Sequence, residues 1–203
     1  MDPHLVLLVL TIVFCYIYAF VGGFTDAANA IATSIGSRSL SPLTAILMAG
    51  ILETVGALTG TAVALTIGKG IVSLELITLS TVLAALLGAM AWSIVTYAYG
   101  IPVSETHGLI GAVIGAGIAA GGTDVIIWSG IVKTLIAIIV SPLVGALGGM
   151  FLMGGIYRFF ARTDATKMRL LFKNLQRGSS AFMAFSHGQN DAQKPMGVLI
   201  MAL

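Results

Sequence analysis

Charged residues are rare in this sequence. Ten Lys and Arg and eight Asp and Glu make up 9% of its 203 residues, while 58% are hydrophobic. A soluble globular domain carries about 25% charged and about 45–50% apolar residues. So few charges exclude an ordinary soluble domain, because the apolar surface needs lipid as its solvent. The sequence therefore predicts an all-α integral membrane protein.

Cysteine is almost absent, and the basic residues are unevenly spread. The single cysteine, Cys15, excludes an intrachain disulfide and lies in an apolar run, where we expect it to pack between helices. Six of the ten basic residues fall within residues 158–177, and they are Arg158, Arg162, Lys167, Arg169, Lys173 and Arg177. The positive-inside rule places this short segment in the cytoplasm. Apolar runs on both sides of it argue against a nucleic-acid surface, and a solvated or lipid-headgroup-binding loop is the simpler interpretation.

Apolar runs near the roughly 20 residues that cross a bilayer divide the chain. We expect spans at residues 5–24, 40–67, 76–99 and 134–157. The first run is too long for a signal-peptide core, and no basic leader precedes it. The run at residues 108–123 is shorter and contains six glycines, which is typical of a re-entrant or broken helix.

Polar residues interrupt the apolar runs at three places. In the first, Asp26 lies beside Thr25 and Asn29, which are four residues apart and fall on one helix face. Carboxylate, amide and hydroxyl oxygens are hard ligands that suit a small cation. The alternative is a helix end that Thr25 or Asp26 merely caps at the membrane surface.

The second polar place lies near the end of the sequence and repeats the first. One helical face carries the four residues His187, Asn190, Asp191 and Lys194. Residues 188–192 align with residues 23–27 and share glycine, aspartate and alanine at the same positions. This match predicts an internal repeat, and many transporters are built from two repeats of inverted orientation.

The third polar place precedes the glycine-rich run. Pro102 is expected to end one helix and Ser104 to cap the next. A helix N-terminus offers free N–H groups, to which Ser104, Thr106 and His107 add side-chain donors, and this combination suits an anion. A turn whose side chains only satisfy each other is the alternative.

One binding site for a cation and an anion explains the three places together and predicts a cation-coupled anion symporter. Glu53, within the span at residues 40–67, costs about 2.5–3.5 kcal/mol on insertion scales. It is protonated, helps to bind the coupling ion, or pairs with a nearby hydroxyl. Glu105 is expected to point away from an anion or to carry a proton.

Two other classes of protein are alternative interpretations of the same residues. A passive anion channel would also use helix ends and hydroxyls, but it has no need of the acidic repeats. A membrane hydrolase would use Asp26, His107 and Asp191, yet the sequence contains no nucleophile elbow and no His-Glu-x-x-His motif. We therefore do not expect an enzyme.

The segments at residues 23–30, 102–107 and 187–194 together resemble the inorganic phosphate transporter family, PiT, in the family's order. The resemblance implies a plasma-membrane, multi-pass symporter of phosphate with inverted repeats and broken or re-entrant helices. Its coupling ion is Na⁺ or H⁺, and it needs no cofactor. By this resemblance the cation ligands, with Na⁺ as the candidate metal, are Asp26, Asn29, Asn190 and Asp191, to which we add Glu53. The phosphate ligands are Ser104, Thr106, His107 and Thr25.

The same resemblance divides the chain. Residues 1–157 form a first transmembrane repeat, residues 158–178 a basic cytoplasmic loop and residues 179–203 the start of a second repeat. We expect the sequence to be a fragment that cannot transport alone, because the second phosphate motif would fall beyond residue 203. Thr25 and Glu105 depart from the family pattern, which leaves the coupling ion open.

The expected partners follow from the same resemblance. They are phosphate, membrane lipid, a PhoU-like cytoplasmic regulator at the basic loop and a second copy in a homo-oligomer, without nucleic acid. Sulfate or another oxyanion is the alternative substrate for the same fold.

Overall fold

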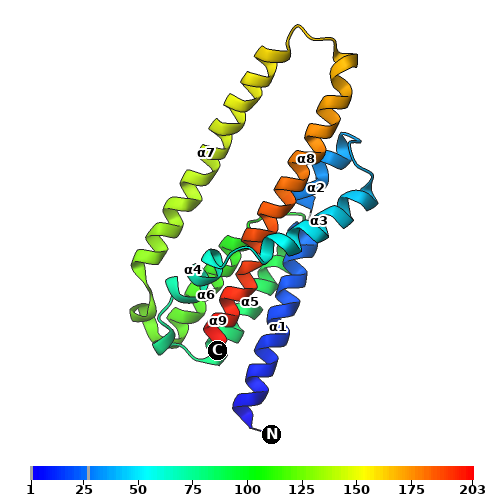
Figure 1. Cartoon of the computed structure of the whole chain (residues 1–203). Coiled ribbons are helices and arrows are strands. Elements are labelled where there is room, and N and C mark those ends of the chain that lie inside the picture. The colour runs from blue at the N-terminus through cyan, green and yellow to red at the C-terminus, as the bar shows by residue number, and fades with distance from the viewer. Residues whose placement is uncertain (1, 27) are drawn as a thin grey trace.

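The computed structural model of the protein describes residues 2–26 and 28–203, without the side chains of Ala165 and Lys167. Ala27 of the first motif and the Lys167 side chain of the basic segment therefore lie outside the described residues. Within these ranges the chain is helical and has no named strand (Figure 1). One isolated bridge joins Val72 to Ile126.

Nine α-helices and two short 3₁₀ turns follow one another in the described part of the chain. They are α1 (Pro3–Asp26), α2 (Ala28–Gly36), α3 (Pro42–Ala57), α4 (Ala62–Gly70), η1 (Leu74–Leu76), α5 (Leu79–Ala98), α6 (Glu105–Gly121), η2 (Gly122–Val125), α7 (Trp128–Phe160), α8 (Ala165–Asp191) and α9 (Gln193–Ala202). Four helical stretches are long and apolar enough to cross a membrane, and α3 with α4 makes a fifth if the bent pair is one span.

The break in a span does not lie where the sequence places it. The run expected to be broken, residues 108–123, belongs to the continuous helix α6 of 17 residues. Three of its glycines serve packing instead, because a Cβ atom at Gly108 would press on Trp92, and one at Gly117 or Gly121 would press on Val125. The run at residues 40–67, expected to be one span, is divided into α3 and α4, which meet at a bend of 62°.

The segment at residues 158–178, expected to be a basic loop, is mostly helix. Helix α7 continues to Phe160, and α8 begins at Ala165 after a short turn. Asp164 caps α8, since its Oδ1 accepts a hydrogen bond of 2.8 Å from the Thr166 N–H. The basic side chains therefore stand on a helical hairpin, and a count of charges does not distinguish a polar helix from a loop.

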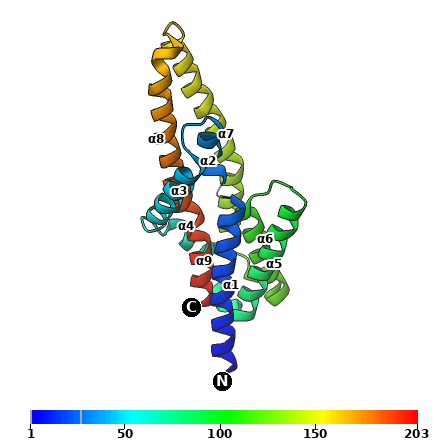
Figure 2. The same cartoon turned by 90° about the vertical axis from the view of Figure 1, so that its right-hand side faces the viewer.

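Two helix pairs of opposite direction form the centre of the molecule. Figures 1 and 2 show α1 and α2 running one way along the long axis, and α8 and α9 running the other way. Helix α1 packs against α9, and α2 packs against α8. Asp26 ends α1 and Asp191 ends α8, so the two aspartates of the sequence repeat meet where the pairs cross. This is the arrangement expected of an inverted repeat.

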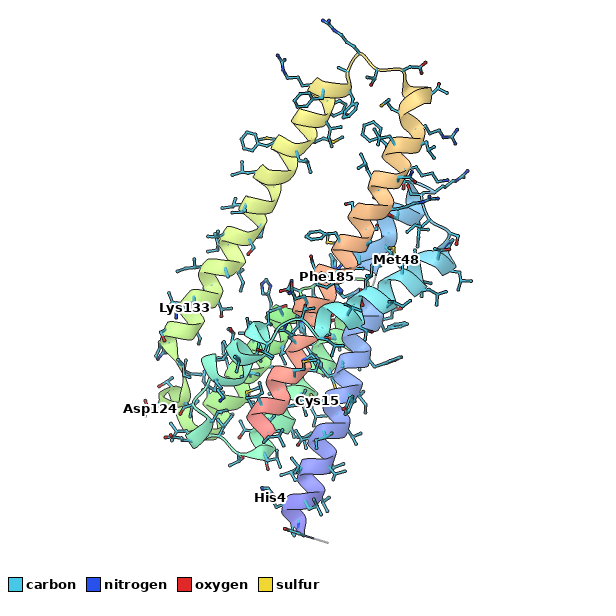
Figure 3. All side chains as sticks on the ribbon, viewed as in Figure 1. His4, Cys15, Met48, Asp124, Lys133 and Phe185 are labelled. Atoms are coloured by element: carbon cyan, nitrogen blue, oxygen red, sulfur yellow. The ribbon has the colours of Figure 1, made fainter. Side chains whose placement is uncertain are left out.

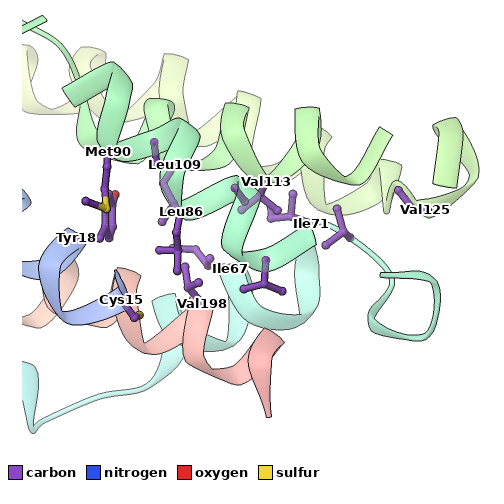
Figure 4. Packing of buried hydrophobic residues seen from close by; sticks show 14 of the residues in the cluster. Cys15, Tyr18, Ile67, Ile71, Leu86, Met90, Leu109, Val113, Val125 and Val198 are labelled. Carbon is purple, nitrogen blue, oxygen red and sulfur yellow. The ribbon is translucent and has the colours of Figure 1, made fainter. Parts of the chain in front are cut away.

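The apolar core lies on one side of that crossing. Leu86, Leu109 and Val198 are fully buried there and come from α5, α6 and α9 (Figure 4). Helix α7, in contrast, has no buried residue among those described, and its apolar side chains point outward along its length (Figure 3). Such a helix suits contact with lipid.

Glycines bring α3 and α8 into backbone contact. A Cβ atom at Gly56 would overlap the carbonyl group of Phe185, and one at Gly188 would overlap the backbone of Glu53. Small residues allow membrane helices to approach in this way. The contact places Glu53 of α3 directly against α8.

A glutamine from α9 caps α4. The buried Gln193 Oε1 accepts hydrogen bonds from Val63 N–H at 3.0 Å and Ala64 N–H at 3.3 Å. Thr61, at the N-cap position of α4, makes no side-chain cap of its own. The first residue of α9 therefore fixes the start of α4, on the far side of the bend.

Replacing Gly56 by alanine is expected to destabilise the protein, because overpacking costs about 1–3 kcal/mol. The matched control is Gly50→Ala on the same helix, where an added Cβ meets nothing within 4 Å. Heating both purified variants in detergent measures the effect as a lower unfolding midpoint for Gly56→Ala alone. Equal midpoints would contradict the backbone contact between α3 and α8.

Gln193→Leu is expected to lower the unfolding midpoint as well, since the loss of a helix cap costs about 0.5–2 kcal/mol. Gln189→Leu serves as the control, because Gln189 only donates an exposed hydrogen bond of 3.2 Å to Thr59. Thermal unfolding of the two variants in parallel provides the comparison. A midpoint for Gln193→Leu no lower than that of the control would exclude a capping role.

Candidate functional site

His187 lies at the centre of the polar cluster. Its Nδ1 is 3.1 Å from Glu53 Oε1, and its Nε2 is 3.3 Å from both Asp26 Oδ2 and Asp191 Oδ2. A neutral imidazole has one N–H donor and one acceptor nitrogen, whereas a carboxylate only accepts. Both nitrogens can therefore interact with the carboxylates in two ways. Each nitrogen carries a proton and donates a hydrogen bond, or the unprotonated nitrogen shares a proton or a cation with the carboxylate that it faces.

The cluster has an excess of negative charge. Lys194 Nζ lies 3.0 Å from Asp191 Oδ2 and is buried. Asn29 donates a hydrogen bond to Asp26 Oδ1. The three carboxylates around His187 face at most two positive charges, those of Lys194 and the imidazole. A further cation at this place would therefore be favoured.

The spacing suits a single ion. Asp26, His187 and Asp191 each offer one ligand atom, and these atoms lie within 4.8 Å of one another. Carboxylate and amide oxygens are the ligands that hard cations prefer. The ring of His187 would join them as a ligand only when its facing nitrogen is unprotonated.

Glu105 is buried between three helices. Its Oε1 accepts a hydrogen bond of 2.9 Å from Thr25 Oγ1, and its Oε2 accepts one of 2.7 Å from Ser93 Oγ. The side chain is only 8% exposed, so it does not point away from the site. Thr25, predicted to bind phosphate, links α1 to the first residue of α6 through this hydrogen bond.

The start of α6 faces the same cluster. Ser104 caps the helix as the sequence predicts, because its Oγ accepts from the His107 N–H at 3.4 Å. Among the described residues, the N–H groups of Glu105 and Thr106 find no acceptor. A helix N-terminus with free N–H groups attracts anions.

A cavity of about 470 Å³ joins the α6 start to the carboxylate cluster. It is lined by Asp26, Asn29, Pro102, Val103, Ser104, Glu105, Thr106, His187, Asp191 and Lys194. A second cavity of about 430 Å³ lies between α1, α3 and the start of α9. Glu105, His187, Asp191 and Lys194 line both cavities, so these four side chains stand between them.

Most of the predicted site residues come together here, but Asn190 and His107 do not, and Thr25 contacts Glu105 without lining either cavity. Asn190 is exposed, and its Nδ2 donates a hydrogen bond of 2.8 Å to the carbonyl of Ser186. His107 is exposed and lines neither cavity. Their roles as a cation ligand and a phosphate ligand stay predictions that the geometry does not support.

The structure adds residues that the sequence did not assign to the site. Lys194 was on the predicted polar face, and a lysine at the edge of an apolar run is a signal that was available. Ser93 gave no signal, since a single serine in an apolar span is common. Only the packing of α5 against α1 and α6 reveals its contact with Glu105.

Comparison with known proteins agrees with this geometry. The sequence profile of the phosphate transporter family matches residues 22–169. A "Probable low-affinity inorganic phosphate transporter" of Bacillus subtilis is 40% identical over 205 residues, which cover 100% of this chain and 62% of that protein. Proteins of the same name from Mycobacterium bovis and Streptomyces halstedii are 40% and 42% identical, and the matches cover 49% and 89% of their lengths.

A solved structure, "The sodium-dependent phosphate transporter", has the same fold. It superimposes with a TM-score of 0.80 at 24% identity, covering 96% of this chain and 66% of that one. The chain thus spans about half to two thirds of the length of several proteins that it matches. It is a multi-pass membrane protein, and the profile match with the 42% identical relative establishes that the chain belongs to the phosphate transporter family.

Proposed function

We propose that the protein carries inorganic phosphate into the cell together with a cation, Na⁺ or H⁺. The observation that carries this proposal is the cavity of about 470 Å³, which presents two opposite chemistries to one ligand space. Its relatives' names point to the same substrate. A PhoU-like regulator, homo-oligomers and the plasma membrane as location stay predictions from the family resemblance.

Part of the cavity lining suits the anion. Ser104 and Thr106 offer hydroxyl groups at the N-terminus of α6, where the first two N–H groups have no acceptor among the described residues. Lys194 adds a positive charge on the same cavity. Phosphate oxygens accept hydrogen bonds from all of these groups.

Other residues of the same cavity suit the cation, and their negative charge favours coupling. Asp26 and Asp191 repel phosphate, and two unit charges of one sign 4 Å apart repel each other by about 4 kcal/mol at an effective dielectric constant of about 20. A cation held by these carboxylates and Asn29 removes most of that repulsion. Because such coupling is reciprocal, bound phosphate also tightens the cation.

The layer between the two cavities supports alternating access. Glu105, His187, Asp191 and Lys194 separate them, and they come from α6, α8 and α9. A relative movement of the α1–α2 and α8–α9 pairs would open one cavity while it closes the other.

The first test measures labelled-phosphate uptake by the protein in its full natural length, reconstituted in liposomes with Na⁺ and H⁺ gradients imposed separately. Uptake is expected to follow one gradient and to fall about tenfold or more in Asp26→Asn, because the variant loses a charge that holds the cation. Asp124→Asn, in the turn η2 outside both cavities, is the matched control and should transport normally.

Other outcomes would point elsewhere. Phosphate flux that persists without any gradient of Na⁺ or H⁺ indicates a channel and contradicts the symporter. Complete inhibition by equimolar sulfate would assign the site to oxyanions in general. Conversion of the labelled phosphate into another compound during uptake would favour an enzyme instead.

Ser104→Ala is expected to raise the KM for phosphate about fivefold to tenfold, since a hydrogen bond to a charged partner contributes about 1.5–3 kcal/mol and water replaces part of it. Ser41→Ala controls for the lost cap, because Ser41 caps α3 in the same way, with a 3.2 Å bond from Thr44 N–H, away from both cavities. Uptake rates over a range of phosphate concentrations provide both values. An unchanged KM in Ser104→Ala would remove this hydroxyl from the phosphate site.

A further inference from the structure

A third cavity lies away from the two central ones, near the tip of the α7–α8 hairpin. Its volume is about 1080 Å³, and it is bounded by the end of α7, the start of α8 and the turn between α2 and α3. Figure 3 shows side chains of this tip spreading away from the centre of the molecule. None of the residues that line the two central cavities lines this one. We call it the basic cavity.

Three positively charged side chains from two segments line the basic cavity. Arg38 comes from the turn after α2, while Arg169 and Lys173 lie one turn apart on α8. In the described part of the chain, none of the three forms an ion pair. The nearby acid in sequence, Asp164, is used to cap α8. The cavity therefore has an uncompensated positive charge.

The opposite wall of the basic cavity is apolar and aromatic. Tyr157 and Phe160 belong to the last turns of α7, and the Phe160 ring meets Phe172 edge to face, with centroids 5.3 Å apart. Helix α7 is long and apolar enough to span the membrane, and its last turn carries the basic residue Arg158, which suits a place near the membrane surface. Aromatic and basic side chains gather at this level of a membrane protein.

The turn that carries Arg38 is held in an unusual conformation. Arg38 has φ 55°, in the left-handed region that non-glycine residues rarely adopt. The turn is fixed from α8, because Arg177 Nε donates to the carbonyl of Ser39 at 2.7 Å. Ser37 and Ser39 share a further hydrogen bond of 2.9 Å between their hydroxyls. These contacts hold Arg38 at the edge of the cavity.

We infer that the basic cavity binds an anionic phospholipid, with its phosphate at Arg38, Arg169 and Lys173 and its glycerol and acyl part along Tyr157 and Phe160. A free phosphate ion would leave the apolar wall in contact with water. A zwitterionic lipid would bring its own positive charge toward the three cations. Only an anionic amphiphile satisfies both walls at once.

The test is native mass spectrometry of the full-length protein in detergent with equal amounts of phosphatidylglycerol and phosphatidylcholine. The protein is expected to retain phosphatidylglycerol. The triple variant Arg38→Gln, Arg169→Gln, Lys173→Gln should bind it about a hundredfold more weakly, since each basic group near an anionic lipid contributes about fivefold. The control variant Lys69→Gln, Arg158→Gln, Arg162→Gln removes the same charge from residues that do not line the cavity and should retain the lipid.

Several outcomes would overturn the inference. These are equal phosphatidylglycerol binding by the two triple variants, equal retention of phosphatidylcholine, and displacement of the lipid by millimolar inorganic phosphate. So would a triple variant that keeps its lipid but no longer binds poly-glutamate, because the cavity would then belong to an acidic protein partner. The single variant Lys173→Gln, with an expected fivefold loss, decides the matter if the triple variant does not fold.

Discussion

A carboxylate at membrane depth needs a partner, and the sharing of His187 by three carboxylates governs the arrangement of the helices. Asp26, Glu53 and Asp191 come from α1, α3 and α8 and reach the same ring. Their contacts require α3 and α8 to touch at the backbone, which is possible only because Gly188 carries no side chain. The glycines and the acids of the sequence are therefore parts of one constraint.

The same constraint links the cation chemistry to the anion chemistry. Glu105 is the first residue of α6, and its carboxylate is held by Thr25, one residue before Asp26. The free N–H groups of α6 thus lie beside the acidic cluster instead of facing lipid. Lys194 and Gln193 extend the connection to α4 and α9. The start of α6 and the acidic cluster line one cavity. The charge of the cluster therefore changes the affinity of α6 for an anion directly.

Local signals in the sequence predicted much of this, while contacts between distant segments were out of reach. The repeat around Asp26 and Asp191 gave the two helix ends that meet, and Pro102 with Ser104 gave the start of α6. Nothing local shows that His187 contacts Glu53, 134 positions away, or that α3 and α4 bend by 62°. The helix at residues 165–178 was missed because apolar runs identify lipid-facing helices, whereas this part of α8 is rich in basic and amide side chains and contains no apolar run.

The scarcity of charge makes each remaining charge informative. Burying an ion without a partner costs several kcal/mol. A membrane protein therefore keeps charged residues mainly where an opposite charge or a hydrogen bond stabilises them. Around His187, the imidazole and Lys194 compensate part of the charge of the three carboxylates. A coupling cation would neutralise the remaining negative charge. At the other end of α8, Arg169 and Lys173 face Arg38 without any described acidic partner, beside an aromatic wall. Helix α8 thus carries a site suited to a cation at one end and a site suited to an anionic amphiphile at the other. The membrane itself supplies the counter-charge for the second site only.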